Sequence, residues 1–298
     1  MTTNGEFIRQ QSIMRDWITA DGSSGYPAAK DRYHLYVCYA CPWAHRTIIM
    51  RKLKGLEDVI SISATHPVRE NNIWVFTEEF PDTANNFSLM TEPYLLTDPS
   101  YPKRCTVPIL WDKESGKILS NESADIIRMF NAEFSEFTPN TDDYYPKNLR
   151  NSIDAVNDKI YQNLNNGVYR SGFAETQDAY SEASAKVFET MDELDQILGE
   201  NRYLTGTQIT EADWRLFPTL VRFDSVYYLH FKCNKKRLVD YPNLWPYTRE
   251  LYQISGIAET VKLDQIKLSY YSNHPSVDPL GIIPIGPDID FLEPHGRQ

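Results

Sequence analysis

Residues 36–46 read Tyr36-Val37-Cys38-Tyr39-Ala40-Cys41-Pro42-Trp43-Ala44-His45-Arg46. The preceding residues 34–37 are apolar enough for a short strand, and residues 43–53 have the apolar spacing of a helix. Pro42 suits the first helical position, where its missing N–H costs nothing. Cys41 is therefore predicted to be the N-cap residue of this helix, at a strand-to-helix turn.

A cysteine at that turn faces free backbone N–H groups and the positive end of the helix dipole, and both favour an anion. Such cysteines often have a pKa of roughly 3.5–7.5 instead of about 8.5. The alternative is a small buried hydrophobic residue, as free cysteines usually are. The order of strand, Cys-Pro-aromatic and helix favours a reactive Cys41 thiolate.

Cys38 and Cys41 form a C-x-x-C pair, which is typical of a dithiol redox site. In a glutaredoxin-type Cys-Pro-x-Cys site, however, the nucleophile precedes the proline and the second cysteine follows three residues later. Ala44 holds that later position here. We interpret Cys41 as a monothiol nucleophile and Cys38 as a structural residue. A monothiol needs an external thiol to complete its turnover, and glutathione is the obvious cytosolic one.

The stretch Cys41-Pro42-Trp43-Ala44 resembles the active-site signature of the glutathionyl-hydroquinone reductases, the Xi class of glutathione transferases. The resemblance covers nearly the whole chain. Its later blocks lie at residues 166–173, 221–227, 230–233 and 256–260. It implies a glutathione transferase fold, with an α/β thioredoxin-like N-terminal domain and an all-α C-terminal helical domain.

The order of predicted elements agrees with that fold. Strands are expected at residues 59–63, 107–111 and 117–119, which gives a β-α-β unit followed by β-β-α. The polar, proline-containing residues 138–147 suggest a linker. We therefore expect a glutathione-binding domain over residues 1–140, with an N-terminal extension and a long, irregular insertion at 65–104. Its last helix is expected to begin at Ser120 or Asn121.

Residues 141–298 are expected to form a helical domain for a hydrophobic substrate, ending in a packed, non-helical tail. Within it, Gly199 is expected to end a helix over 177–198, and a Thr-x-x-Asp capping box at Thr210 to open the next, with 216–226 as the central helix. Two more helices are expected at 241–254 and 257–263.

Composition limits the partners and the compartment. The chain has 298 residues, a net charge of −11 and no run of Lys or Arg, which argues against nucleic acid or an anionic membrane as a partner. It has no run of about 18 apolar residues that could span a membrane. Residues 1–15 do not read as a signal peptide. Four cysteines do not make a disulfide scaffold, so we expect a reducing compartment, the cytoplasm.

Two short stretches are candidates for binding glutathione. Val107 and Pro108 open the third predicted strand, and Glu122 and Ser123 lie at the first turn of the next helix, where N–H groups suit a carboxylate. The resemblance implies that Pro108 is cis and faces the nucleophile, that the Val107 backbone pairs with the cysteinyl part of glutathione, and that Glu122 and Ser123 hold its γ-glutamyl end. Simple helix capping is the alternative for the last pair.

The resemblance also places Trp74, from the insertion, and Arg104 near glutathione. A plain surface residue is the alternative interpretation of Arg104. Cys105 has no assigned role.

Three tyrosines are implied to act on the substrate: Tyr169, Tyr227 and Tyr270, with Tyr271 as an alternative to the last. A thiolate that attacks the thioether sulfur of a glutathionyl-hydroquinone must expel a ring carbon. This is feasible if the ring first adopts its keto tautomer. Tyrosine hydroxyls can donate hydrogen bonds to the ring oxygens and supply protons.

The expected activity is glutathione-dependent reduction of small aromatic glutathione conjugates. Cys41 would become a mixed disulfide with glutathione, and a second glutathione, the co-substrate, would release oxidised glutathione. No metal is expected, because the six histidines show no ligand spacing. The resemblance suggests a homodimer. Two alternatives remain: an omega-like thiol transferase or dehydroascorbate reductase, and a non-catalytic transferase-like binding module.

Overall fold

The computed structural model describes residues 4–297. It divides into two compact units. One consists of Gln10–Asp143 and Asp264–Ser269. The other, the helical unit, consists of residues 4–9, Tyr144–Leu263 and residues 270–297. Neither unit is one continuous stretch of sequence.

The first unit is built on a mixed four-stranded sheet. Its strands are β1 (Tyr33–Val37), β2 (Ser61–Ala64), β3 (Ile109–Asp112) and β4 (Lys117–Ser120), in the order β2-β1-β3-β4. β1 is parallel to β2 and antiparallel to β3, and β3 is antiparallel to β4. Leu35 opposes Leu110 across β1 and β3, and neither is exposed. This is the predicted thioredoxin-like arrangement, although β2 begins two residues later than expected.

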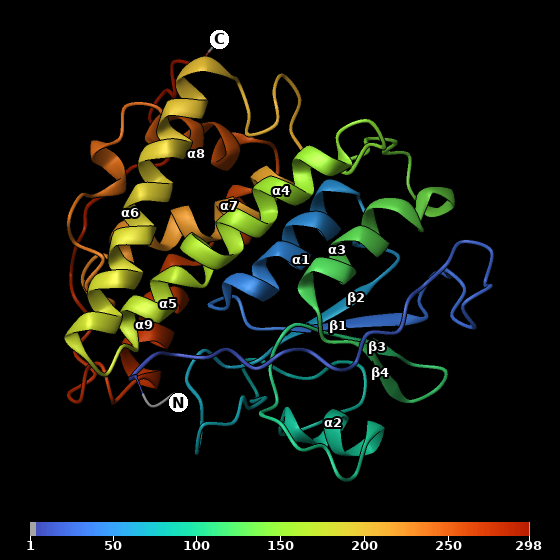
Figure 1. Cartoon of the computed structure of the whole chain (residues 1–298). Helices are drawn as coiled ribbons and strands as arrows, with labels where there is room; N and C mark the ends of the chain where they lie inside the picture. Colours follow the sequence, from blue (N-terminus) through green and yellow to red (C-terminus); the bar gives the residue numbers. More distant parts are fainter. Residues whose placement is uncertain (1–3, 298) are drawn as a thin grey trace. The chain divides into compact units, whose positions relative to one another are not determined.

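Helices cover both faces of this sheet. α1 (Pro42–Leu53) and α3 (Ser123–Ala132) lie side by side on one face, and α2 (Thr91–Thr97) lies on the other side (Figure 1). α2 is a correction, because the whole insertion was expected to be irregular. Pro93 is the third residue of α2, and a proline is tolerated in the first turn of a helix. The start of α3 is also later than expected, at Ser123 instead of Ser120 or Asn121.

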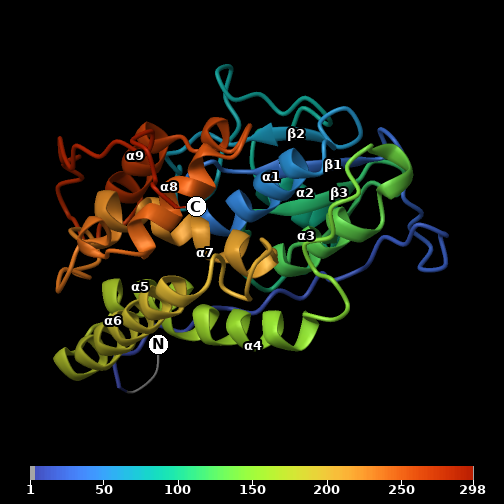
Figure 2. The ribbon, with the colours of Figure 1, turned by 90° about the horizontal axis from the view of Figure 1, so that it is seen from above.

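The helical unit contains the remaining helices. They are α4 (Arg150–Ile160), α5 (Gly167–Gly172), α6 (Gln177–Glu200), α7 (Glu211–Arg222), α8 (Leu244–Gln253) and α9 (Leu263–Asn273). The part of α9 that directly follows Leu263, Asp264–Ser269, belongs to the first unit. α4, α5 and α6 follow one another along one side of the helical unit, and α5 packs on α6 (Figure 2). Short π-helical turns follow α4 at Tyr161–Asn165 and α7 at Phe223–Tyr227.

α7 is the central helix of this unit, as predicted. Its N-terminus carries the expected capping box between Thr210 and Asp213. All of its residues except Arg215 are buried, including Pro218 inside the helix. The buried π-helical turn that follows contains Tyr227.

Three expectations for the helical unit were wrong. Gly199 was expected to end α6, but the helix continues to Glu200. A Cβ at Gly199 would lie 3.1 Å from the Asn243 amide nitrogen, so the glycine allows a close contact. A helix was expected at residues 257–263, but only a 3-10 turn forms at Ala258–Thr260, and α9 begins at Leu263. The tail was expected to be packed, but Leu280 and Ile285 are 80% and 101% exposed.

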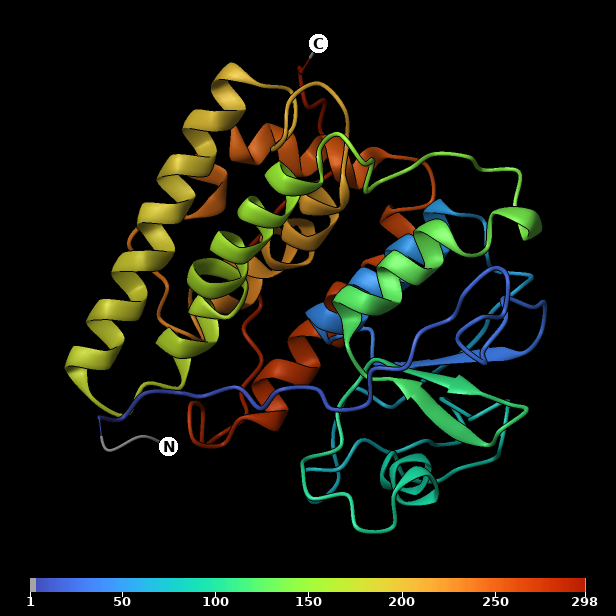
Figure 3. The same cartoon turned by 45° about the vertical axis from the view of Figure 1, so that its right-hand side comes forward.

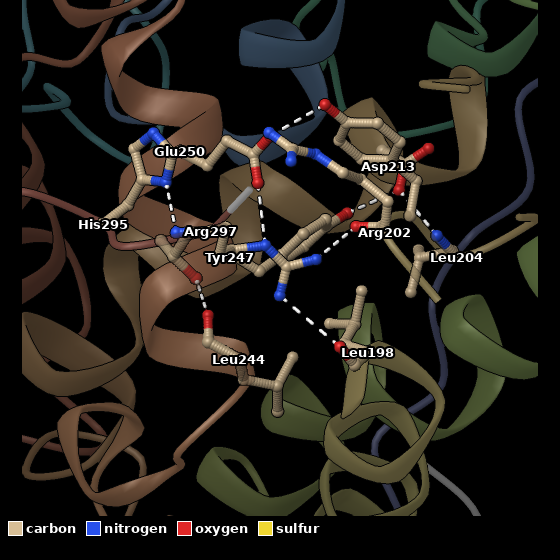
Figure 4. A network of polar contacts seen from close by, with 11 residues as sticks. Leu198, Arg202, Leu204, Asp213, Leu244, Tyr247, Glu250, His295 and Arg297 are labelled. Carbon is tan, nitrogen blue, oxygen red and sulfur yellow. Dashed lines mark hydrogen bonds and ion pairs between the residues drawn. The ribbon is translucent and has the colours of Figure 1, made fainter. Parts of the chain in front are cut away.

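The last described residue is nevertheless held firmly. The Arg297 guanidinium donates to Glu250 Oε2 at 2.7 Å and also to the backbone carbonyl of Arg202 (Figure 4). Arg202 pairs with the other oxygen of the same carboxylate. Because Glu250 is only 6% exposed, this paired carboxylate fixes the chain end to α8.

No helix within residues 4–297 has both the length and the apolar character needed to cross a membrane.

Candidate functional site

Cys41 is the N-cap residue of α1, as its position before Pro42 predicts. Its backbone is extended, with φ −77° and ψ 121°, and the His45 N–H donates to its carbonyl at 2.9 Å. The side chain is half-buried and does not cap the helix itself. The thiol is therefore placed beside the first N–H groups of α1, where an anion is favoured.

Val107 and Pro108 lie against this cysteine. The Cys41 thiol donates to the Val107 carbonyl oxygen at 3.4 Å. The Val107–Pro108 peptide bond is cis, as the resemblance implied, and both residues are buried. The structure thus brings together three of the predicted site residues at the edge between β3 and the start of α1.

Glu122 and Ser123 occupy the N-terminus of α3. Glu122 is the N-cap residue, and its carboxylate accepts a bond from the Ala124 N–H at 3.0 Å. Ser123 is 2% exposed. The structure therefore shows Glu122 in the capping role that was the alternative, and its role toward glutathione stays a prediction.

Trp74 and Arg104 lie on the insertion between β2 and β3. The Arg69 guanidinium lies 4.1 Å from the centroid of the Trp74 ring, which is 5% exposed. Arg104 is exposed, and its backbone exchanges two hydrogen bonds with the Gln10 side chain. Arg69 was not singled out from the sequence, because no spacing pattern links it to Trp74.

The other cysteines differ from Cys41. Burial raises the pKa of Cys38 to about 11 and that of Cys233 to about 12, and neither side chain is exposed. Burial also raises the pKa of the half-buried Cys105. These thiols stay protonated near neutral pH, which agrees with a structural role for Cys38.

The three predicted tyrosines meet within the helical unit. The Tyr270 hydroxyl lies 2.5 Å from the Tyr169 hydroxyl and 3.0 Å from the Tyr227 hydroxyl. We call this set the tyrosine chain. Its members come from α5, from the π-helical turn after α7, and from α9. All three side chains are at least nine-tenths buried.

Tyr270, and not Tyr271, belongs to this chain. The Tyr271 hydroxyl is buried and makes no hydrogen bond within the described residues, and its ring packs 4.7 Å from that of His230. Burial raises the pKa of Tyr227 and Tyr270 well above the ordinary value. Both hydroxyls therefore keep their protons at neutral pH and can act as hydrogen-bond donors.

Two residues near the tyrosine chain were missed from the sequence. Phe7 stacks on Tyr169 with ring centroids 6.4 Å apart, and the Arg9 guanidinium lies 4.4 Å from the Tyr169 centroid. They belong to a short segment without periodicity, far from Tyr169 in the sequence. No pattern could have connected them.

Among residues 4–297, no group of three or more His, Cys, Asp or Glu side chains is arranged to hold a metal ion.

Comparison with known families identifies two matching domains. Residues 40–133 match the glutathione S-transferase N-terminal domain, and residues 177–250 match the glutathione S-transferase C-terminal domain. These matches include the cysteine turn and the start of α3 in the first case, and α6 and α7 in the second.

Full-length relatives and solved structures are similar throughout. The chain is 54% identical to glutathionyl-hydroquinone reductase YqjG of Escherichia coli, over 100% of this chain and 94% of that protein. It is 46% identical to glutathionyl-hydroquinone reductase PcpF of Sphingobium chlorophenolicum, over 96% and 91% of the two chains. The glutathione-bound structure of YqjG has a TM-score of 0.93 and 54% identity, with coverage of 95% of this chain and 96% of that one. The glutathione S-transferase Xi from Phanerochaete chrysosporium has a TM-score of 0.91 and 47% identity, with coverage of 95% and 98%.

These similarities extend over both units and include the residues from which the resemblance was first drawn. The chain belongs to the glutathione transferase family and, within it, to the Xi-class group that contains the glutathionyl-hydroquinone reductases.

Proposed function

We propose that this protein reduces S-glutathionyl-hydroquinones to hydroquinones at the expense of glutathione. Its similarity to two reductases with that activity in their names supports this proposal. The observation that carries it is the tyrosine chain, in which three buried hydroxyls bond in sequence. Tyrosine hydroxyls can donate hydrogen bonds to the two ring oxygens of a hydroquinone and supply a proton to the ring. Reduction of a small disulfide or of dehydroascorbate does not need them.

The two units supply different chemistry in this proposal. Gln10–Asp143 provides Cys41 as the nucleophile, and it provides Trp74, Arg104, Val107, Pro108, Glu122 and Ser123 for glutathione. The helical unit provides Tyr169, Tyr227 and Tyr270 for the hydroquinone part. A homodimer in the cytoplasm is proposed as the working form, on the resemblance and on the cysteine usage.

The reductive step begins when the conjugate ring adopts its keto tautomer. The Cys41 thiolate attacks the thioether sulfur, an S–S bond forms, and the C–S bond breaks with its electron pair passing into the ring. The resulting enolate takes one proton from the tyrosine chain and becomes the hydroquinone. The protein is left with a Cys41–glutathione mixed disulfide.

The second step restores the enzyme. The sulfur of a second glutathione attacks the glutathione sulfur of the mixed disulfide, which releases oxidised glutathione and the Cys41 thiolate. The proton of that second thiol replaces the one used in the first step. The sum is one conjugate and one glutathione converted to one hydroquinone and one oxidised glutathione.

The decisive experiment compares the wild type with Cys41→Ala. Hydroquinone release from a glutathionyl-hydroquinone is measured with added glutathione, and the intact mass is recorded. We expect no turnover in the variant and a transient adduct of one glutathione on the wild type. Cys38→Ala is the matched control and is expected to retain turnover, because the buried Cys38 thiol stays protonated.

A wild type that leaves the conjugate intact but reduces dehydroascorbate or a model mixed disulfide would contradict the proposal. In that case an omega-like thiol transferase would replace it. A wild type that does neither, but binds glutathione, would indicate a binding module.

A further inference from the structure

The N-terminal segment, residues 4–9, is fastened to the turn between α5 and α6. The Glu175 N–H donates to the Gly5 carbonyl at 2.9 Å, and the Thr176 hydroxyl donates to the Asn4 carbonyl at 3.0 Å. Figure 3 shows the segment, in dark blue, beside this turn. Gly5 has φ +74°, and a Cβ there would lie 2.7 Å from the Thr176 methyl group, so only glycine fits.

This anchorage places Arg9 over one member of the tyrosine chain. The Arg9 guanidinium carbon is 4.4 Å from the Tyr169 ring centroid, within cation–π range. Arg9 Nε donates to the Asn166 side-chain oxygen at 2.7 Å, which fixes the guanidinium from the start of α5. Arg9 also lies 5.4 Å from the Phe7 centroid.

Tyr169 is held on its other sides by aromatic rings. The centroids of Phe231 and Phe173 lie 5.2 Å and 6.2 Å from its own. Its hydroxyl bonds to Tyr270. Arg9 thus adds a positive charge beside a ring that Phe7, Phe173 and Phe231 also contact.

A second cation, Arg222, acts on the tyrosine chain. Arg222 is fully buried at the end of α7, donates to the Pro218 carbonyl at 2.8 Å, and acts electrostatically to lower the pKa of Tyr227 and Tyr270 against the larger effect of burial. Two positive groups therefore act on the tyrosine chain, Arg9 on Tyr169 and Arg222 on Tyr227 and Tyr270. A phenolate formed by loss of one proton would be stabilised by both.

We infer that Arg9 is a positioning residue for the reductive step. It fixes the Tyr169 ring and stabilises the negative charge left on the tyrosine chain. This inference rests on the proposed function. In the reductive step the enolate gains one proton and the chain carries one phenolate until the second glutathione supplies a proton. Arg9 has no task in the second step.

The test separates the two half-reactions in Arg9→Met. In single turnover, hydroquinone release should be slowed by roughly 10-fold, which corresponds to about 1.4 kcal/mol and is within the range of cation–π contacts. Reduction of the preformed Cys41–glutathione mixed disulfide by glutathione should keep its wild-type rate. Arg9→Lys should recover part of the loss, since it keeps the cation but cannot reproduce the bond to Asn166 in the same geometry.

Arg15→Met is the matched control. Arg15 lies in the same N-terminal part of the chain, its side chain is 55% exposed, and it pairs with Asp125. We expect both half-reactions to be unchanged in this variant.

Equal rates for Arg9→Met and the wild type in both half-reactions would overturn the inference, and so would equal slowing of both. If Arg9→Met does not fold, Arg9→Lys decides by the same criterion: selective slowing of hydroquinone release supports the inference, and any other result overturns it. Failure of the proposed function is distinct, because then the wild type itself releases no hydroquinone.

Discussion

Tyr270 is the residue that makes three separate hydroxyls into one chain. Its hydroxyl is hydrogen-bonded to the hydroxyls of both Tyr169 and Tyr227 and so connects them. Its neighbour Tyr271 has a buried hydroxyl without a hydrogen-bond partner in the described residues. Adjacent tyrosines on α9 therefore offer a natural comparison between a connected and an unconnected hydroxyl.

We predict that Tyr270→Phe lowers kcat for hydroquinone release by roughly 10²-fold, the lower end of what a general acid contributes. The substitution removes the central hydroxyl and leaves two buried hydroxyls with one partner fewer. Tyr271→Phe should leave kcat unchanged and leave the thermal midpoint unchanged or raised, because it deletes an unpaired polar group. Steady-state kinetics on both variants checks this. Equal losses of kcat in the two variants would show that the tyrosine chain has no special role.

Some site residues could be predicted from the sequence because the signal is local. Cys41, Pro42 and the following helix lie within a few residues, so their geometry follows from capping rules. Val107–Pro108 and Glu122–Ser123 also lie at element boundaries that are visible in the sequence. Arg9 and Arg69 were missed because tertiary packing, and not sequence spacing, brings them to their aromatic partners.

At the scale of elements, the N-terminus of α7 depends on one buried carboxylate. Asp213 is fully buried and accepts bonds from the Leu204 N–H at 3.0 Å and from the Tyr247 hydroxyl at 2.7 Å (Figure 4). It also accepts a bond from the Thr210 N–H at 2.8 Å. It thereby joins the helix start, the preceding loop and α8. The capping box was visible in the sequence, but the bond to Tyr247 was not.

We predict that Asp213→Ala destabilises the protein by roughly 3–5 kcal/mol, because several buried donors lose their acceptor together. Asp240→Ala is the control: its side chain is 40% exposed and pairs with Arg237. That variant should stay within about 0.5 kcal/mol of the wild type. Urea unfolding of both variants measures the difference. A loss for Asp213→Ala no larger than that of the control would contradict the prediction.

The elements that were mispredicted share a physical cause. α2 begins with Thr-Glu-Pro in a proline-containing insertion, and α9 carries polar residues around most of its circumference. Neither shows the apolar periodicity on which helix prediction depends. Both are helices because of the tertiary structure around them, which a single sequence does not display.

Two buried histidines, His34 and His230, make the stability of the whole protein depend on pH. Burial lowers the pKa of His34 and of His230 to about 4 from 6.5, and the side chains are at most 4% exposed. Between pH 6.5 and 4 the unfolded chain binds more protons than the folded one. The free energy of unfolding therefore falls as the pH is lowered through this window, by up to roughly 3 kcal/mol for each ring.

Denaturant unfolding at a series of pH values between 7.5 and 4 measures this slope. The double variant His34→Asn, His230→Asn should show a shallower slope in the window, whatever its stability at pH 7.5. An unchanged slope would mean that other groups are responsible.

The discontinuity of the two units has a consequence for recombination between relatives. A chimera joined in the linker near residue 143 takes residues 4–9 from one parent and Tyr144–Leu263 from the other, although both belong to the helical unit. Arg9 and Tyr169 would then have different ancestries. A second crossover just after Arg9 would keep the pair from one parent, so functional hybrids should require two junctions wherever the parents differ in their first residues.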